Sequence, residues 1–311
     1  MERNDGWRQR LPALARDERG NVIALVSLSM VALLAFAGLV IDGGLLMATR
    51  AQMQKAANAA ALSAAQELTT SEAAVEAVAE TVLHRHGEHA HMDRLEVSMQ
   101  DRVYVGLTAE VPLGFAGIFG FDAAPVSVAA IAELGRMGSA IGAAPLGIDE
   151  SIPLAYGVEY RLKVDNTMSE TGYFGVLALG GPGAATYEDN LRYGYQGWLG
   201  LNDVLETQTG NIAGKTRSSI AERLTNCPYP EGEMFHRDCP RILLVPVYRP
   251  HSYESKQLKA VEITGFAYFY VTKPMDPHDT YITGKFIQRA GTGFARQEAA
   301  DKGAFAIRLT E

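Results

Sequence analysis

The sequence has few cysteines and no excess of positive charge. Its 311 residues include two cysteines, too few for a disulfide scaffold, and its formal net charge of −8 argues against a general nucleic-acid binder. Hydrophobic residues at 47% and charged residues at 21% exclude a disordered chain. A chain of this length can bury one large core or two smaller ones.

Charged residues are also missing from positions 22–41, which read VIALVSLSMVALLAFAGLVI. A helix of this length extends about 30 Å, the thickness of the hydrocarbon core of a bilayer. Five arginines precede this segment, whereas only Arg50 and Lys55 follow it over the next twenty residues. Because Lys and Arg favour the cytoplasmic side, we expect a cytoplasmic arm at residues 1–21, a transmembrane helix at 22–41 and an extracytoplasmic remainder.

A cleaved secretory signal is the alternative to a membrane anchor. Such a signal has an apolar core of about 7–15 residues before a small-residue cleavage site. Here the apolar run is longer and leads into DGGLLMATRAQMQKAANAAALSAAQEL, so we expect the helix to continue to about Leu68. Thr69 and Glu72 form a T-x-x-E capping pattern, which predicts a second helix over residues 70–86 that ends at Gly87.

From Arg94 onward the apolar residues alternate as in strands. RLEVSMQDRVYVGLTAEV predicts a hairpin that turns at Gln100 and Asp101, and PVSVAAIAEL can pair with it. Residues 135–148 are small and glycine-rich, which predicts a linker between the stalk helices and small sheet of residues 42–134 and a β-rich domain at 149–311. The predicted fold class is α+β, with a long N-terminal helix followed by a mainly antiparallel extracytoplasmic region.

The segment TGNIAGKT resembles a phosphate-binding loop, yet Gly210 and Gly214 enclose only three residues where a P-loop has four. The preceding NDVLETQ is too polar for a central parallel strand. An extracytoplasmic loop would also be separated from cytosolic ATP. We therefore expect no nucleotide here, glycines that serve a turn, and a solvent-facing Lys215.

Four histidines, His84, His86, His89 and His91, lie within eight residues, which is dense enough for a zinc or copper site to be considered. They lack HExxH spacing, so we interpret them as a solvated helix end and loop, with metal binding as a weak alternative. Ser218, Ser219 and Ser252 have no nucleophile-elbow context. Outside the cytoplasm, Cys227 and Cys239 are expected to form a structural disulfide. The sequence thus predicts no catalytic residue and no cofactor.

Residues 18–68 resemble the amino-terminal segment of TadE/TadG-like proteins of Tad (Flp) pilus assembly. The resemblance rests on an RG pair, an apolar helix, GLxxDGG and a Q-x-Q-x-A-A-x-A-A-A-L run, with its motif residues at Arg19, Gly20, Gly38, Asp42, Gln52, Gln54, Ala57 and Ala59 to Leu62. A weaker similarity to a TadG-like subgroup includes Gly210 and Gly214 of TGNIAG.

The chain departs from this family in two places. Processed TadE-type pseudopilins carry a Glu five residues after the cleaved Gly, whereas here that position is Leu25, so the resemblance leaves cleavage after Gly20 open. Some TadG proteins end in a von Willebrand A domain with a D-x-S-x-S metal site. Asp165, Thr167 and Ser169 approach that pattern, but the strand-like GYFGVLALGG follows them instead of a helix.

The resemblance implies a non-catalytic, outward-facing, membrane-anchored accessory protein of pilus assembly, similar to a minor pilin. Its expected partners are pilus subunits, other pilus-assembly membrane proteins and the lipid bilayer, without nucleic acid or nucleotide. Two alternatives stay open: a surface adhesin or binding module on a membrane anchor, and a tethered metal-dependent extracytoplasmic enzyme that uses the histidines.

Overall fold

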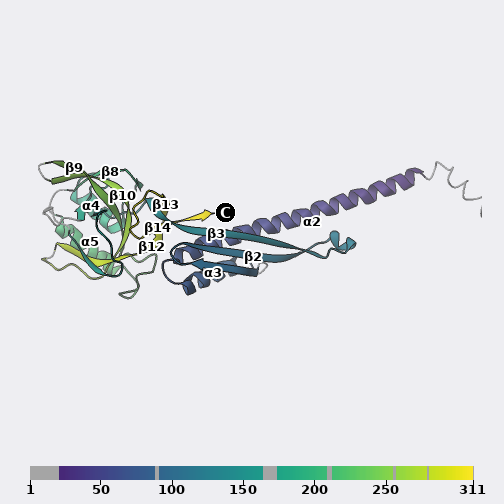
Figure 1. Ribbon diagram of the computed structural model, residues 1–311, viewed down its shortest axis with the longest axis horizontal. Coiled ribbons are helices and arrows are strands. Elements are labelled where there is room, and N and C mark those ends of the chain that lie inside the picture. The colour runs from purple at the N-terminus through teal and green to yellow at the C-terminus, as the bar shows by residue number, and fades with distance from the viewer. Residues whose placement is uncertain are drawn as a thin grey trace, which may run out of the picture. The chain divides into compact units, whose positions relative to one another are not determined.

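The computed structural model describes residues 21–87, 91–163, 174–208, 212–254, 257–278 and 280–310. These residues form two compact units, and Figure 1 labels many of their helices and strands. The described part of the first unit comprises residues 21–55, 91–93 and 107–128. The second unit comprises the remaining described residues.

One long helix, α2 (Asn21–Ala64), contains the uncharged segment and continues into the short 3-10 helix η1 (Ala65–Glu67). The predicted continuation to about Leu68 is confirmed. Helix α3 (Glu72–His86) follows and ends at Gly87, whose φ of 115° stops the helix as expected. Its N-cap is Ser71, whose side chain accepts a hydrogen bond from Ala74 N, so the predicted cap at Thr69 was wrong by two residues.

The first sheet has the strand order β1-β2-β3-β14-β12, and β7 and β13 also pair with β3. Its strands are β1 (His91–Ser98), β2 (Arg102–Pro112), β3 (Ala123–Ala140), β7 (Leu199–Gly200), β12 (Arg289–Gly291), β13 (Gly293–Ala295) and β14 (Ala304–Thr310). Between β2 and β3 lies the 3-10 helix η2 (Ala116–Phe119). The hairpin turn predicted at Gln100 and Asp101 is confirmed, with Gln100 at φ 63°.

The expected linker at residues 135–148 is wrong, because β3 extends to Ala140 and β4 (Leu146–Asp149) follows shortly after it. The glycines of this segment provide close packing instead of flexibility. A Cβ on Gly135 would collide with the Ala295 side chain, and a Cβ on Gly138 would collide with Arg296. Small residues here therefore let the chain of β13 approach β3.

The second sheet has the order β5-β11-β10-β9-β4-β6, with β8 paired to β10. Besides β4, its strands are β5 (Glu159–Lys163), β6 (Phe174–Val176), β8 (Val204–Glu206), β9 (Ile242–Glu254), β10 (Gln257–Val271) and β11 (Tyr281–Ile287). Its pairs are antiparallel except β4 with β9. The described residues thus confirm an α+β fold with a mainly antiparallel β region.

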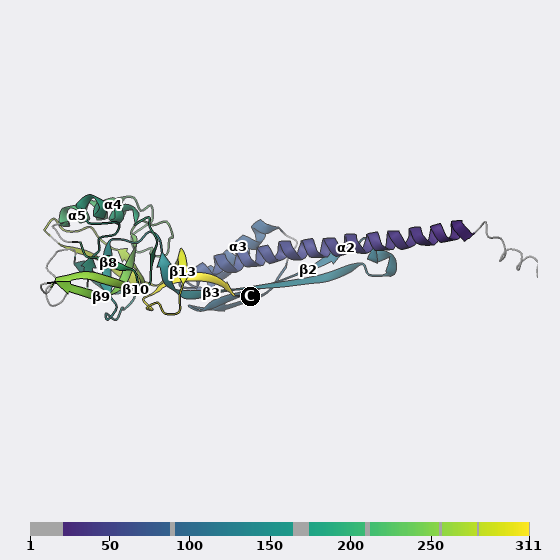
Figure 2. The ribbon, with the colours of Figure 1, turned by 90° about the horizontal axis from the view of Figure 1, so that it is seen from above.

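Two helices, α4 (Ala184–Tyr193) and α5 (Ala213–Thr225), lie together on one side of this sheet in Figure 2. Tyr187 of α4 and Thr216 of α5 are buried and share a hydrogen bond of 2.8 Å. Since successive strand residues face opposite sides, Phe269 packs in the core beside these helices and Tyr268 packs in the core of the other face.

Candidate functional site

The apolar part of α2 is exposed along its length. Among the described residues one helix, Val22–Glu67, is long and apolar enough to cross a membrane. Only 6% of its most apolar stretch of 18 residues is buried. Large side chains from Val22 to Ile41 are exposed, including Leu28, Leu33 and Phe36. A soluble protein would bury such a surface, so a lipid environment accounts for it better than a protein core.

Asp42 stands directly after this apolar segment, and its carboxylate holds the loop between β2 and β3. It accepts backbone N–H groups from Gly114 at 3.0 Å, Phe115 at 3.0 Å and Ala116 at 2.7 Å. Both carboxylate oxygens are used, and the Asp42 side chain is buried although the preceding Leu39, Val40 and Ile41 are exposed. The acidic side chain therefore acts as a clamp between α2 and this loop.

Gly38 lies one helical turn before Asp42 and contacts the same loop. A Cβ at Gly38 would lie 2.6 Å from Cβ and Cγ of Phe115, so only glycine leaves room for this ring. By contrast, a Cβ at Gly43 or Gly44 would meet nothing within 4 Å among the described residues. Gly38 and Asp42, two motif residues four positions apart, thus form one docking site for the loop at residues 113–121.

The other motif residues of α2 differ in their surroundings. Gln52 is exposed, whereas Ala57 is fully buried in the second unit together with other alanines: Ala56, Ala60, Ala61, Ala64 and Ala65. Small side chains in this run allow close packing of the helix. Gln54 is half-buried. Arg19, Gly20 and Gly210 lie outside the described residues, as does the sequence around Asp165, Thr167 and Ser169.

The expected turn at Gly214 is wrong. Gly214 lies in the first turn of α5 and is not among the glycines with positive φ. Lys215 is exposed as expected, and its Nζ also lies 2.5 Å from a carboxylate oxygen of Glu188, whose side chain is only 13% exposed. Arg192 and Ser218 also contact Glu188. The hydrogen bond from Lys215 is the main cause that lowers the pKa of Glu188. The lysine therefore joins α5 to α4.

The structure describes three of the four histidines that the sequence singles out. His84 and His86 are exposed in the last turn of α3, His91 is exposed at the start of β1, and His89 lies outside the described residues. Across the residues that the structure describes, no group of three or more His, Cys, Asp or Glu side chains could hold a metal ion.

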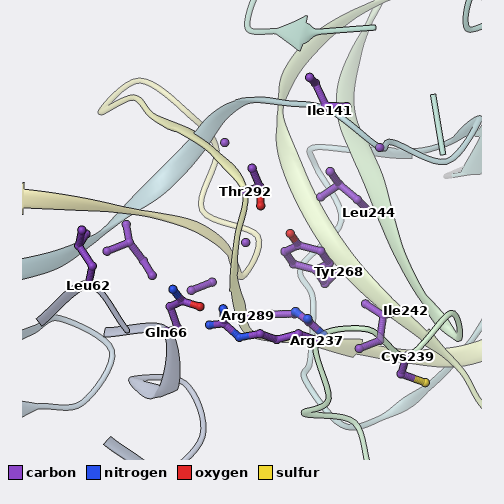
Figure 3. A pocket seen from close by; sticks show the side chains of 15 residues that line it. Leu62, Gln66, Ile141, Arg237, Cys239, Ile242, Leu244, Tyr268, Arg289 and Thr292 are labelled. Carbon is purple, nitrogen blue, oxygen red and sulfur yellow. The ribbon is translucent and has the colours of Figure 1, made fainter. Parts of the chain in front are cut away.

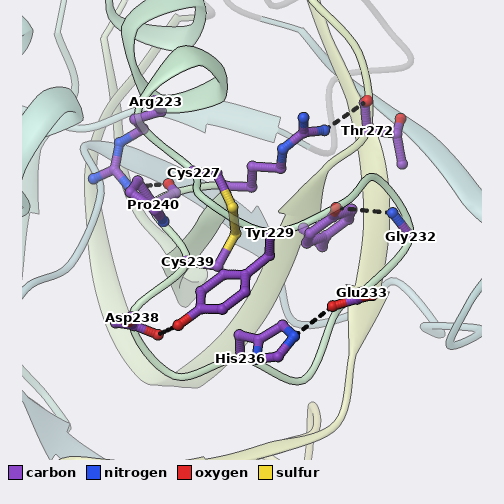
Figure 4. Close-up of a disulfide and its surroundings, with 12 residues drawn as sticks. Arg223, Cys227, Tyr229, Gly232, Glu233, His236, Asp238, Cys239, Pro240 and Thr272 are labelled. Carbon is purple, nitrogen blue, oxygen red and sulfur yellow. Dashed lines mark hydrogen bonds and ion pairs between the residues drawn. A yellow bond between two sulfur atoms is a disulfide. The ribbon is translucent and has the colours of Figure 1, made fainter.

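Cys227 and Cys239 form a disulfide with a Cα–Cα distance of 5.2 Å, which confirms the sequence prediction. Figure 4 shows that the enclosed loop is also held by side chains. The Tyr229 hydroxyl donates a hydrogen bond to the Asp238 carboxylate at 2.6 Å, and the Tyr229 ring stacks on the His236 ring with 3.6 Å between the ring centres. Gly232 N donates a hydrogen bond to Tyr270 Oη of the sheet. The loop is thus built as a structural element of the second unit.

A cavity of about 550 Å³ lies beside this loop in the second unit (Figure 3). Two arginines from separate elements, Arg237 and Arg289, lie next to each other in it, and the Arg289 guanidinium is 5.6 Å from the Tyr268 ring centre. Burial lowers the pKa of both guanidinium groups. Adjacent cations in a cavity suit an anionic group such as a carboxylate or phosphate.

Sequence reasoning singled out Gly38 and Asp42 but missed the loop that they hold. The loop could have been recognised from the sequence LGFAGIFGF, which has three phenylalanines and no charge in nine residues. No sequence pattern indicated that Arg237 and Arg289 share a cavity, since they lie 52 positions apart.

Comparison with known proteins bears on the segment that contains this site. Residues 20–67 match the family model described as "Putative Flp pilus-assembly TadE/G-like", and this range includes Gly38, Asp42, Gln52, Gln54 and Ala57. Neither the curated proteins nor the solved structures contain a match to the chain. The amino-terminal segment of this chain is therefore TadE/TadG-like, which connects the protein with the assembly of Tad (Flp) pili.

Proposed function

We propose that this protein is a membrane-anchored, outward-facing accessory protein of Tad pilus assembly, similar to a minor pilin and without catalytic activity. The observation that carries the proposal is α2, whose first half exposes apolar side chains and whose second half is packed into a folded unit. One continuous helix thereby joins a lipid-compatible segment to a β-rich domain. The family match over residues 20–67 supplies the link to pili.

The orientation follows from the charges that flank the apolar segment. Five arginines precede it, which favours a cytoplasmic amino terminus and an external β-rich domain. The disulfide between Cys227 and Cys239 agrees with this orientation, since disulfides persist outside the cytoplasm. A reporter that is active only outside the cytoplasm should work when fused after residue 311, and a cytoplasmic reporter should be silent. The opposite pattern would overturn the orientation.

Partner contacts are tested by photo-crosslinking in cells that make the pilus. A photoreactive amino acid at Met47, an exposed position of α2 beyond the apolar segment, should capture a pilus subunit or another assembly protein. The same group at Tyr253, an exposed position of β9, is the matched control. Crosslinks to pilus proteins that form from position 47 and not from position 253 support the proposal. Crosslinks at neither position to any pilus protein would contradict it.

A binding module on a membrane anchor is the second candidate, and the cavity with Arg237 and Arg289 is the observation that favours it. Inorganic phosphate is a suitable probe for such a site. Phosphate should raise the melting temperature of the protein above the value measured in chloride at equal ionic strength. The Arg237→Gln variant should not show this increase. An equal increase in the variant would show that the arginine cavity does not bind the anion.

A tethered metal-dependent enzyme is the third hypothesis, and no arrangement among the described residues favours it specifically. Metal retained in stoichiometric amount after dialysis would support it over the two non-catalytic proposals.

A further inference from the structure

The loop at residues 113–121, here called the aromatic loop, presents large apolar side chains outward. Ile118 is 78% exposed, Phe119 is 72% exposed and Phe121 is 66% exposed. The sequence LGFAGIFGF contains no charged residue, and Asp122 follows directly after it. Neighbouring exposed apolar side chains of this size mark a surface that contacts a membrane or another molecule.

The clamp at Asp42 fixes where this loop lies along α2. The N–H groups of Gly114, Phe115 and Ala116 bind the carboxylate itself, so the loop backbone lies at the level of residue 42. Phe115 packs on Gly38, about 6 Å further toward the apolar end of the helix. If residues 22–41 span the hydrocarbon core, the loop therefore lies at its edge, within the interfacial layer.

The backbone of the loop is suited to a medium that offers few hydrogen bonds. Asp42 accepts three of its N–H groups, and the carbonyl groups of Phe115, Ala116, Gly117 and Asp122 accept others. The donors satisfied in this way are Leu113, Gly114, Phe115, Ala116, Ile118, Gly120 and Phe121. Irregular backbone enters the apolar region of a membrane at low cost only when its polar groups are satisfied internally.

We propose that the aromatic loop inserts Ile118, Phe119 and Phe121 into the outer interfacial layer of the same bilayer that α2 crosses. This inference rests on the membrane anchor of the proposed function. The loop acts as a second contact with lipid, and the Asp42 clamp sets the depth of α2 relative to the membrane surface. Lipid is the occupant because Phe115 of the loop packs on Gly38 of the apolar segment, which places the exposed apolar side chains of the loop beside those of α2 within one unit.

Single fluorescent labels on the full-length protein test this proposal. The two native cysteines are joined in the disulfide, so an introduced cysteine is the reactive thiol. An environment-sensitive nitrobenzoxadiazole label is attached to Phe119→Cys or Ile118→Cys, and the protein is placed in vesicles of phosphatidylethanolamine and phosphatidylglycerol. Val31→Cys in the apolar segment and Phe235→Cys on the exposed disulfide loop are the two controls.

Labels in the aromatic loop should emit at shorter wavelength than the label at Phe235. Nitroxide lipids labelled near the headgroup should quench them at least about twofold more strongly than the Phe235 label, and iodide in the buffer should quench them less. A loop label that behaves like the Phe235 label, while the Val31 label is quenched by lipid, would overturn this inference and leave the anchor intact. A Val31 label in water would instead overturn the anchor.

A third result separates lipid from protein. A loop label that is shielded from iodide but not quenched by any nitroxide lipid would mean that a protein, such as a second copy of this chain, covers the aromatic loop. That result would also overturn the proposal.

Discussion

Among single residues, Asp42 holds the aromatic loop most directly, through its carboxylate and three backbone donors. Asp42→Ala leaves the N–H groups of Gly114, Phe115 and Ala116 without this acceptor, and hydrogen bonds to a charged group are stronger than neutral ones. We expect the exchange of these amide hydrogens to accelerate by about tenfold or more. Hydrogen exchange measured by mass spectrometry on peptides that cover residues 113–121 reports the change.

Asp122→Ala is the matched control for the clamp. It removes the same charge from an exposed side chain at the end of the same loop. Exchange should remain near the wild-type rate in this variant. Equal acceleration in both variants would show that the effect of Asp42→Ala reflects a general change in charge instead of the clamp.

Gly38 provides the second prediction at this scale. In Gly38→Ala the new methyl group would overlap the Phe115 ring, which must then move away from α2. Gly43→Ala introduces the same methyl group where nothing lies within 4 Å among the described residues. We expect faster exchange in residues 113–121 for Gly38→Ala and no such change for Gly43→Ala. Exchange that is unchanged in Gly38→Ala would contradict the packing of Phe115 on this glycine.

The sequence marked Gly38 and Asp42 as motif residues, yet it did not show what they contact. Asp42 and the loop residues whose N–H groups donate to it are separated by 72 to 74 positions. Local patterns report periodicity and turn chemistry, whereas a contact of this kind depends on how distant strands return to the helix. The residue type was therefore recognisable, and its role was not.

At the scale of elements, the disulfide closes the loop between α5 and β9. The double replacement Cys227→Ser and Cys239→Ser removes the crosslink between two residues that are 12 positions apart in the sequence. It should lower the free energy of unfolding by about 3 kcal/mol, because the unfolded chain is then less restricted. Thermal melting with and without reductant checks this value. Reduction should destabilise the wild-type protein by about as much as the double replacement does. A wild-type protein that keeps its stability after reduction would contradict a structural role of the disulfide.

The contact between α4 and α5 is predicted to depend on pH. Lys215 is the main cause that lowers the pKa of Glu188 below its ordinary value of 4.5. A carboxyl group with a lowered pKa in the folded state stabilises the protein above its unfolded pKa, and this contribution is lost as the pH falls through the folded value. Lys215→Met should therefore lower the melting temperature by roughly 1–3 °C at neutral pH and have less effect at an acid pH where Glu188 is protonated in the folded state.

Lys259→Met serves as the control for this measurement, because Lys259 pairs with the exposed Glu254 at 3.6 Å. An exposed pair of this kind contributes little. The same loss for Lys215→Met at both pH values would show that the lysine acts through its aliphatic packing and not through Glu188.

Element types were largely predictable, and the exceptions have physical causes. The long helix follows from the uncharged apolar run and its continuation, and the hairpin at Gln100 follows from the alternation of apolar residues. Residues 135–140 resembled a linker because glycine is usual in flexible segments, but here Gly135 and Gly138 provide space for neighbouring chains. The first turn of α5 was hidden by Gly214, whose low helix propensity is overridden by the packing of this helix.

In the molecule as a whole, chain segments that are far apart in the sequence form the same sheet. In the first sheet β3 pairs with β14, so that Ile131 lies opposite Thr310. Such non-local pairing is not determined by the sequence of either strand alone. The sequence therefore predicted the fold class and the long apolar helix but not the strand order.

The central claim is that the protein is a membrane-anchored accessory of Tad pilus assembly. The most direct measurement is the number of surface pili, counted by electron microscopy, in cells that lack the chain and carry either the wild-type gene or a form without residues 22–41. We predict few or no pili without the chain, restoration by the wild type, and no restoration by the form without the anchor. Normal pili in cells that lack the chain would contradict the account.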